Sequence, residues 1–263
     1  MRPYLVVLSA RFRTLLQYRG AALGGFGTQL FWGIIRKMIF EGFYHSTTAP
    51  MPLSLTQTID YIWLGQAFFV IIPWQTDSEV RQAIRTGTVA YELLRPLDLY
   101  GLWYARSVAS RVAPAILRAA PMLLVSYLFF GLRLPSSSGS AAAFAAAVAG
   151  AILMSAAFTT LMTVSLMWSI SDAGINRFIP TLVFLLSGMV VPLPLFPAWA
   201  QRAISFLPFR SVADVPFRLY SGQIPVQAIA SLGVYELCWI CLLVTVGRAL
   251  VGLGTRRLVI QGG

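Results

Sequence analysis

The stretch Ala141–Trp168 reads AAAFAAAVAGAILMSAAFTTLMTVSLMW and contains no charged residue. A run of about 20 mostly apolar residues is long enough to cross a bilayer as an α-helix. Five more runs share this character, namely Gly20–Phe43, Ile59–Trp74, Val112–Leu132, Phe178–Phe196 and Val226–Leu250. Because backbone groups cannot stay unpaired in lipid, and because the runs are continuous rather than alternating, they indicate helices and not a β-barrel. The sequence predicts an all-α integral membrane protein with six transmembrane helices in one domain, residues 1–263.

The composition of the whole chain supports this prediction. Hydrophobic residues make up 57% and charged residues 11%, whereas soluble domains carry about 25% charged residues. The net charge of +11 raises the possibility of a nucleic-acid partner. With the N-terminus inside and six crossings, however, most of the basic residues fall on the inner side, as they do in membrane proteins. We therefore expect both termini in the cytoplasm, the lipid bilayer as a partner, and no nucleic acid.

Residues 1–19 precede the first apolar run and show helical periodicity. The apolar residues Leu5, Leu8, Phe12 and Leu15 recur at helical spacing. The polar residues Ser9, Arg13 and Gln17 fall on another face. This pattern predicts an N-terminal amphipathic interfacial helix on the inner membrane surface. The alternative is a simple basic flank to the first span. Basic residues interrupt the segment, so it does not have the apolar core of a cleavable signal.

Residues 76–100 are a polar insert between apolar runs. Thr76 and Glu79 have the spacing of a capping box, and Gly87 is a typical helix end. A short amphipathic cytoplasmic helix is therefore expected over Ser78–Thr86, with an apolar stripe of Val80, Ala83 and Ile84. The insert also mixes apolar residues with charges. We interpret the mixture as an interface for a protein partner, the alternative being a plain solvated loop. The charged candidates are Glu79, Arg81, Arg85, Glu92, Arg95 and Asp98.

The segment 191–225 is rich in proline and lies before the last apolar run. Within it, Ala198–Phe206 is helical in pattern but too short to cross a membrane. Irregular backbone at membrane depth is tolerated where protein covers it. The segment is therefore predicted to be an extracellular re-entrant hairpin.

The stretch Ile84–Asp98, IRTGTVAYELLRPLD, resembles the first cytoplasmic loop of type-2 ATP-binding-cassette (ABC) transporter permeases, and in particular a bacterial branch of uncharacterised transport-system permeases. Gly188–Trp199, followed by Leu207–Phe209, is similar to the extracellular hairpin of that family. The closing Arg256–Gly263 is similar to its C-terminal tail.

The resemblance implies an ABC exporter with two permeases and two cytoplasmic ABC ATPase subunits. The second permease would be the same chain or a paralogous one in a heteromeric complex. The helix Ser78–Thr86 would be the coupling helix, seated in a groove of the ATPase. The resemblance also implies a location in the bacterial cytoplasmic (inner) membrane, with ATP and Mg bound by the partner ATPase. An apolar lateral path would suit an amphiphilic substrate.

The chain has little of the chemistry that an enzyme needs. The only lysine, Lys37, is not preceded by the glycines of a phosphate-binding loop, so we expect no ATPase site here. The only histidine, His45, falls in a predicted outer loop, so we expect no serine–histidine hydrolase, and a single histidine cannot form a two-histidine zinc site. We therefore expect a transport subunit, with no catalytic, cofactor-binding or metal-binding residues of its own.

Two other function classes remain as alternatives. A gradient-driven transporter or channel would need ionisable groups inside the membrane, and Glu236 in the last span is the main candidate. We interpret Glu236 as a translocation-path candidate, the alternative being a buried hydrogen bond to a neighbouring helix. A membrane thiol oxidoreductase would depend on Cys238 and Cys241, whose spacing matches a redox pair. Two small packing residues on one helix face explain that spacing as well.

Overall fold

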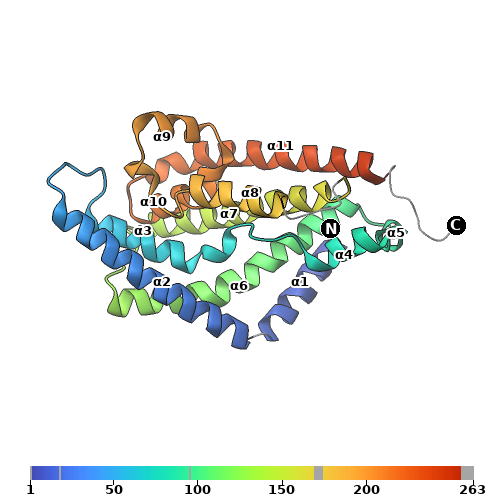
Figure 1. Ribbon diagram of the computed structural model, residues 1–263, viewed down its shortest axis with the longest axis horizontal. Helices are drawn as coiled ribbons and strands as arrows, with labels where there is room; N and C mark the ends of the chain where they lie inside the picture. The colour runs from blue at the N-terminus through green and yellow to red at the C-terminus, as the bar shows by residue number, and fades with distance from the viewer. Residues whose placement is uncertain (1, 18, 95, 169–173, 256–263) are drawn as a thin grey trace.

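The computed structural model describes residues 2–17, 19–94, 96–168 and 174–255, and within these ranges it contains helices and no strand (Figure 1). The longer helices are α1 (Arg2–Gln17), α2 (Arg19–Ser46), α3 (Leu55–Ala67), α6 (Leu99–Phe129), α7 (Ser138–Ser165), α8 (Ile175–Leu186) and α11 (Ile229–Thr255). Shorter helices occupy the connections: α4 (Ser78–Thr86), α5 (Val89–Leu93), α9 (Ala198–Ser205) and α10 (Asp214–Tyr220).

Three helices of the described chain are long and apolar enough to cross a membrane. They are Leu99–Phe129, Ser138–Ser165 and Val226–Thr255, and they confirm the apolar runs predicted in these parts of the sequence. Of the other predicted spans, α2 is a regular helix of 28 residues that is less apolar, α8 is short, and α3 gives way to a 3-10 turn at Phe69–Ile71. The chain is an all-α protein of membrane type, while the count of six spans stays a prediction.

Two predicted spans have different boundaries in the structure. Helix α6 begins at Leu99 rather than near Val112, so two arginines expected before the span, Arg106 and Arg111, lie within the helix. Helix α8 stops at Leu186 rather than continuing to Phe196. Gly188 follows with φ +88°, a left-handed conformation that glycine adopts at little cost.

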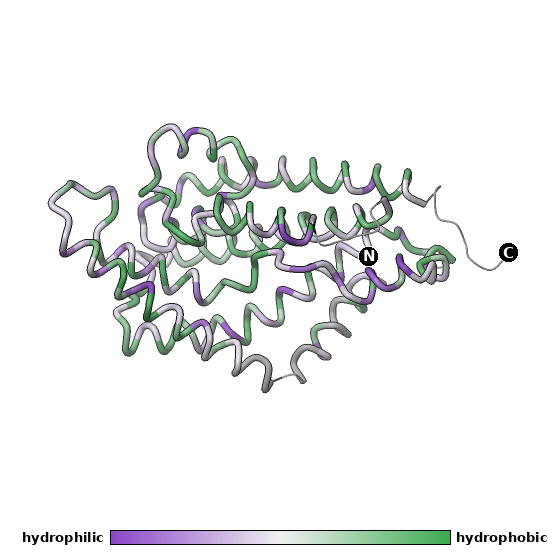
Figure 2. Tube along the Cα trace, viewed as in Figure 1, coloured by the Kyte–Doolittle hydropathy of each residue, from purple (hydrophilic) through white to green (hydrophobic). Residues whose placement is uncertain are grey.

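The long helices lie side by side, and the polar elements gather at the two ends of the bundle. Figure 1 shows α4, α5 and the C-terminal end of α11 at one end. The loop between α2 and α3, together with α9 and α10, lies at the other end. Figure 2 shows hydrophobic residues along α7 and α11 and hydrophilic residues around α4. This separation is the one that a helical bundle in a bilayer requires.

Two of the three apolar clusters of the described residues hold the main helices together. The larger one joins α3, α7 and α10 through buried residues that include Trp63, Met154 and Phe217. The second joins the α4–α5 connection to α6, α7 and α11 through Val80, Val89, Tyr100, Trp103, Val164 and Val251. The connection at residues 76–100 is therefore part of the packed structure and not a loop suspended in solvent.

Buried polar contacts fix the end that carries α9 and α10. Arg133 donates to the buried Asp60 carboxylate from Nη2 (2.6 Å) and Nε (3.0 Å). The Tyr220 hydroxyl of α10 donates to the Arg133 carbonyl oxygen (2.7 Å). Tyr61 of α3 donates to Asp214 at the start of α10 (3.2 Å). Residues 191–225 are thus folded back against α3, as a hairpin requires; whether they enter a bilayer stays a prediction.

Helix α1 packs along α6, and its Tyr4 hydroxyl accepts a hydrogen bond from the backbone N–H of Asp98 (3.2 Å). The helix predicted over residues 1–19 is therefore present as Arg2–Gln17. Its interfacial position stays a prediction.

Gly33 allows α2 and α3 to approach closely. A Cβ atom at this position would lie 2.4 Å from Cζ3 of Trp63, which is fully buried. Real carbon atoms do not approach so closely, so any side chain at residue 33 displaces Trp63 or separates the two helices.

We expect Gly33→Leu to lower the thermal unfolding midpoint of the purified protein by several degrees, because overpacking costs about 1–3 kcal/mol. Gly42→Leu, on the same helix where a Cβ meets nothing within 4 Å, is the control and should change the midpoint little. Equal midpoints for the two variants in detergent would contradict the close contact.

Candidate functional site

Helix α4 is defined by local signals at both ends. The Asp77 carboxylate accepts hydrogen bonds from the backbone N–H groups of Glu79 (3.0 Å) and Val80 (3.4 Å), which caps the first turn. At the other end Gly87 has φ 74° and closes the helix. The predicted range Ser78–Thr86 is confirmed. The predicted capping box is wrong, because the cap is Asp77 and the Oγ1 atom of Thr76 is buried without a partner in the described chain.

Arg106 of α6 holds the first turn of α4 in place. Its guanidinium donates to Asp77 from Nε (3.0 Å) and Nη2 (3.2 Å), and to Glu79 from Nη2 (2.5 Å). Bonds between charged groups of this kind are about twice as strong as neutral ones. One helical turn earlier on α6, Trp103 Nε1 donates to Glu92 of α5 (2.9 Å). Both short helices are therefore fastened to the first turns of α6.

Asp98 joins three helices at the same end of the bundle. Its carboxylate accepts from the Gly101 N–H (2.8 Å), which caps α6, and lies 3.4 Å from Nη2 of Arg248 on α11. Its own N–H donates to Tyr4 of α1. Three predicted interface residues, Glu79, Glu92 and Asp98, therefore have contacts within the chain. Reading the sequence identified their positions but not these partners, which lie far along the chain.

The outward face of α4 and α5 carries a different set of residues. Arg81 and Arg85 line an open cavity of about 400 Å³ together with Ser78 and Gln82. Tyr91 of α5 is 71% exposed, and Leu94 just after α5 is 81% exposed. We call this surface the α4–α5 ledge, made of Arg81, Gln82, Arg85, Tyr91 and Leu94. Among the other predicted interface residues, Arg95 lies outside the described residues.

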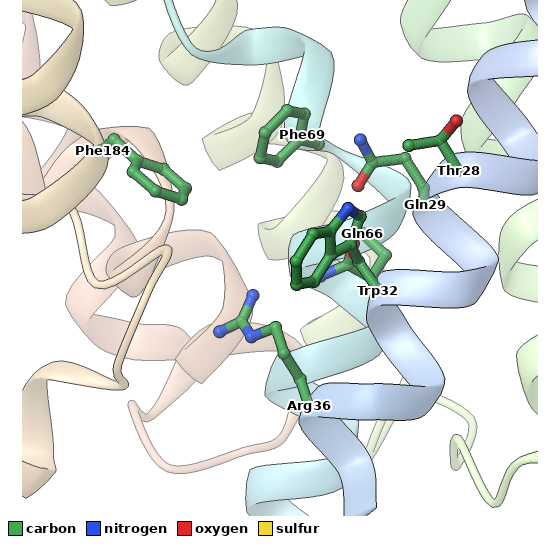
Figure 3. Close-up of a pocket in the computed structure, with 7 residues that line it drawn as sticks. All are labelled: Thr28, Gln29, Trp32, Arg36, Gln66, Phe69 and Phe184. Atoms are coloured by element: carbon green, nitrogen blue, oxygen red, sulfur yellow. The ribbon is translucent and has the colours of Figure 1, made fainter. Parts of the chain in front are cut away.

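A second candidate region is a groove of about 400 Å³ between α2, α3 and α8 (Figure 3). Its polar lining consists of Thr28, Gln29 and Arg36 from α2 and Gln66 from α3. With the Gln66 amide in the orientation that gives both of its ends a partner, it donates to Gln29 Oε1 (2.6 Å) and accepts from Arg36 Nη1 (3.1 Å). Arg36 Nη2 donates to the carbonyl oxygen of Val190 (2.5 Å), just beyond α8. A polar network thus spans the three elements.

Aromatic rings form the rest of the groove. Trp32 comes from α2, Phe69 from the 3-10 turn after α3, and Phe184 from α8. Figure 3 shows the rings of Phe69 and Phe184 above Arg36. The centroids of Phe69 and Phe184 lie 5.8 Å apart, edge to face. Concave sites with apolar walls and a few placed polar groups are the usual form of a small-molecule site.

Glu236 lies between α11 and α7, away from this groove. It is 8% exposed, and a Cβ at Gly150 of α7 would lie 2.3 Å from its Oε2 atom. Its Oε1 atom has no hydrogen-bond partner among the described residues. The structure thus places Glu236 in a tight interhelical contact, and a role in a translocation path stays a prediction. Cys238 and Cys241 on the same helix are exposed and unbonded to each other.

Arg111 is a buried polar residue whose role the sequence did not reveal. Arg111 lies between α6 and α7. Its Nε donates to Ser155 (2.7 Å) and its Nη2 to Thr159, both on α7, and its Nη1 donates to the Ser107 carbonyl oxygen of α6 (2.8 Å). Ser155 in turn donates to the carbonyl oxygen of Ile71. Arg111 therefore pins the turn after α3 to α6 and α7. The four-residue spacing of Ser155 and Thr159, in a helix without charged residues, was the available signal.

The long apolar helices are those of a multi-pass membrane protein. A family model described as ABC-2 family transporter protein matches residues 54–262. The chain therefore belongs to the ABC-2 transporter family and is a permease of an ABC transporter, which confirms the resemblance seen in its sequence. Family membership implies an ABC ATPase as partner. No curated protein and no solved structure matches the chain.

We expect Arg106→Gln to loosen α4 without unfolding the bundle, since it removes bonds that each contribute about 1.5–3 kcal/mol. Limited digestion with trypsin should then cut after Arg81 or Arg85 about fivefold faster or more. Arg13→Gln on the exposed face of α1 is the control. Cleavage of Arg106→Gln at the wild-type rate would show that α4 does not depend on this contact.

The Glu236 contact is tested with a double-mutant cycle. Gly150→Ala should destabilise the protein by about 1–3 kcal/mol, because the new methyl group overlaps the carboxylate. In Gly150→Ala combined with Glu236→Ala that overlap is absent, so the two effects should not add. Unfolding midpoints measured in one detergent give the four values. Strict additivity would mean that the two residues do not touch.

Proposed function

We propose that this permease is the membrane subunit of an exporter, driven by ATP hydrolysis on a separate ABC ATPase that docks on the α4–α5 ledge. The proposal rests on one observation about residues 76–100: some of their side chains attach the segment to the bundle, and others face outward. Val80 and Val89 are buried, and Asp77, Glu79 and Glu92 are bonded to α6. The ledge is thereby held rigidly and turned outward, as a docking surface must be.

The composition of the ledge supports a protein partner. Protein interfaces combine apolar side chains at the centre with charged groups around them. Tyr91 and Leu94 supply exposed apolar surface, and Arg81 and Arg85 supply positive charge. The fitting partner surface is an acidic, partly apolar groove on a cytoplasmic protein. This placement puts the ledge and both chain termini in the cytoplasm and α9 and α10 outside, in the bacterial inner membrane.

The same contacts suggest how force would be transmitted. Because Arg106 and Trp103 fasten α4 and α5 to α6, closure of the ATPase would move the ledge and α6 together. Arg111 links α6 to the turn after α3, and that turn contributes Phe69 to the groove. Displacement at the ledge would thus reach α2, α3 and α8, where we place the path of an amphiphilic substrate. A second permease, identical or paralogous, would complete the path.

Arg81→Glu combined with Arg85→Glu should reduce the amount of ATPase that co-purifies with the tagged chain by about tenfold or more, since like charges would then face each other. Arg202→Glu on α9, at the opposite end of the protein, is the matched control and should retain wild-type recovery. Retention of the ATPase by the double variant, with normal stimulation of ATP hydrolysis, would refute docking on this ledge.

A further inference from the structure

We propose that the groove between α2, α3 and α8 selects an amphiphile with an acidic headgroup, and that the guanidinium of Arg36 binds this headgroup. The inference rests on the proposed function, because it names the substrate class of that path. It follows from the charge of the lining, from what Arg36 is bonded to, and from a second arginine, Arg118 of α6, that packs against the same face of α2.

Arg36 is the one charged residue that lines the groove within the described chain. Its hydrogen bonds go to neutral groups, namely the Val190 carbonyl and the Gln66 amide. No carboxylate among the described residues pairs with it, whereas Arg106, Arg133 and Arg218 each have an aspartate partner. An arginine in an apolar bundle without a counter-ion is costly. A ligand with a negative charge would remove that cost.

Arg111 provides a comparison for Arg36, because it too lies in the bundle without a carboxylate partner among the described residues. Arg111 is buried, but each of its three nitrogens donates to an oxygen of the surrounding helices. It therefore has no free side toward a cavity. Arg36 differs because its guanidinium borders an open space, as Figure 3 shows.

A second arginine, Arg118 of α6, packs against the face of α2 that carries Arg36. Gly25, Gln29, Trp32 and Arg36 succeed one another at spacings of four, three and four residues, so they share one face of the helix. The Arg118 guanidinium lies against Gly25, with its Cζ 2.9 Å from the point that a Cβ atom on residue 25 would occupy. Its Nε atom is buried and has no partner in the described chain. Within the described residues neither arginine pairs with a carboxylate, and the two positions on α2 at which they lie, Gly25 and Arg36, are about 16 Å apart along the helix.

The aromatic lining supplies the second half of the selectivity. Trp32, Phe69 and Phe184 offer apolar surface for a ring or an acyl chain beside the charged headgroup site. A free inorganic anion would leave this surface unused and would bind weakly. A cationic amphiphile would meet Arg36 and would find no carboxylate in the lining. The groove therefore favours a molecule that combines an anionic oxygen group with an apolar body.

The test compares probes that share one chain and differ in headgroup. The complex purified through a tag on this chain is placed in nanodiscs of zwitterionic lipid. Equilibrium binding is then measured for dodecyl phosphate, for dodecyltrimethylammonium and for inorganic phosphate. We expect dodecyl phosphate to bind at least about tenfold more tightly than either of the others, because a charge-assisted contact and apolar burial act together.

Variants of the lining test whether the headgroup preference arises in the groove. Arg36→Gln should weaken binding of dodecyl phosphate about tenfold, and Arg36→Lys should recover part of the loss because it keeps the charge. Since Arg36 also bonds to Val190, Thr28→Asp provides an independent variant that leaves Arg36 in place. It adds a carboxylate to the lining and should shift preference from dodecyl phosphate toward dodecyltrimethylammonium. Arg202→Gln, on exposed α9, is the control and should bind as the wild type does.

The outcomes separate this inference from the proposed function. Equal binding of the acidic and cationic probes by a complex that still hydrolyses ATP would overturn the substrate class alone. Unchanged binding in both Arg36→Gln and Thr28→Asp would also overturn it. A tagged chain that recovers no ATPase would instead count against the proposed function, while headgroup preference in the isolated permease would continue to support this inference.

Discussion

Polar groups in a helical bundle within lipid must find partners inside the protein, and this constraint explains where the charged side chains of the permease lie. Asp60 and Arg133 satisfy each other at one end. Arg106, Asp77 and Glu79 do so at the other end. In the interior, Arg111 is satisfied by hydroxyl and carbonyl oxygens of α6 and α7. Most of these contacts join segments that are distant in sequence, so the same bonds that remove the cost of burial also fix the packing.

Some helices are held together by several contacts, and others are joined by few. The ledge is fastened to α6 by Arg106 and Trp103, and α6 is fastened to α7 by Arg111. Around the groove, α2 and α3 are locked together at Gly33, where Trp63 fills the available space. Helix α8 is joined to α2 there by the contact of Arg36 with Val190. In the described chain, the polar contact of Arg36 with Val190 closes one side of the groove, and a substrate that displaces this contact could widen the groove.

Much of this architecture was predictable from local sequence. The apolar runs predict three of the long helices, and the cap pattern with Gly87 predicts the correct bounds of Ser78–Thr86, because helix ends depend on neighbouring residues. The same pattern indicates Thr76 as the capping residue, whereas the cap is Asp77. Asp77 also binds Arg106, 29 positions away, and no local rule contains that information. The end of α8 likewise depends on Gly188 and on a tertiary bond to α10.

The candidate interface residues show the same difference between local patterns and contacts made by distant residues. The outward position of Arg81 and Arg85 follows from the pattern of one short helix, so the sequence was sufficient. The inward contacts of Glu79, Glu92 and Asp98 depend on Arg106, Trp103 and Arg248, and only the folded chain brings these together. In the sequence, Arg36 falls within an apolar span and has no evident role. Its place beside Gln66 and Phe184 requires the packing of three helices.

The central claim is that the ledge and α6 move as one body while the groove changes shape. Spin labels in a variant with Cys238 and Cys241 replaced by serine test it by pulsed electron resonance. One pair, Phe31→Cys and Leu185→Cys, spans the groove, and another, Gln82→Cys and Ile116→Cys, joins α4 to α6. Between nucleotide-free and ATP-trapped complex, the account predicts a changed distance for the first pair and a constant one for the second. A constant first distance with a changed second distance would contradict it.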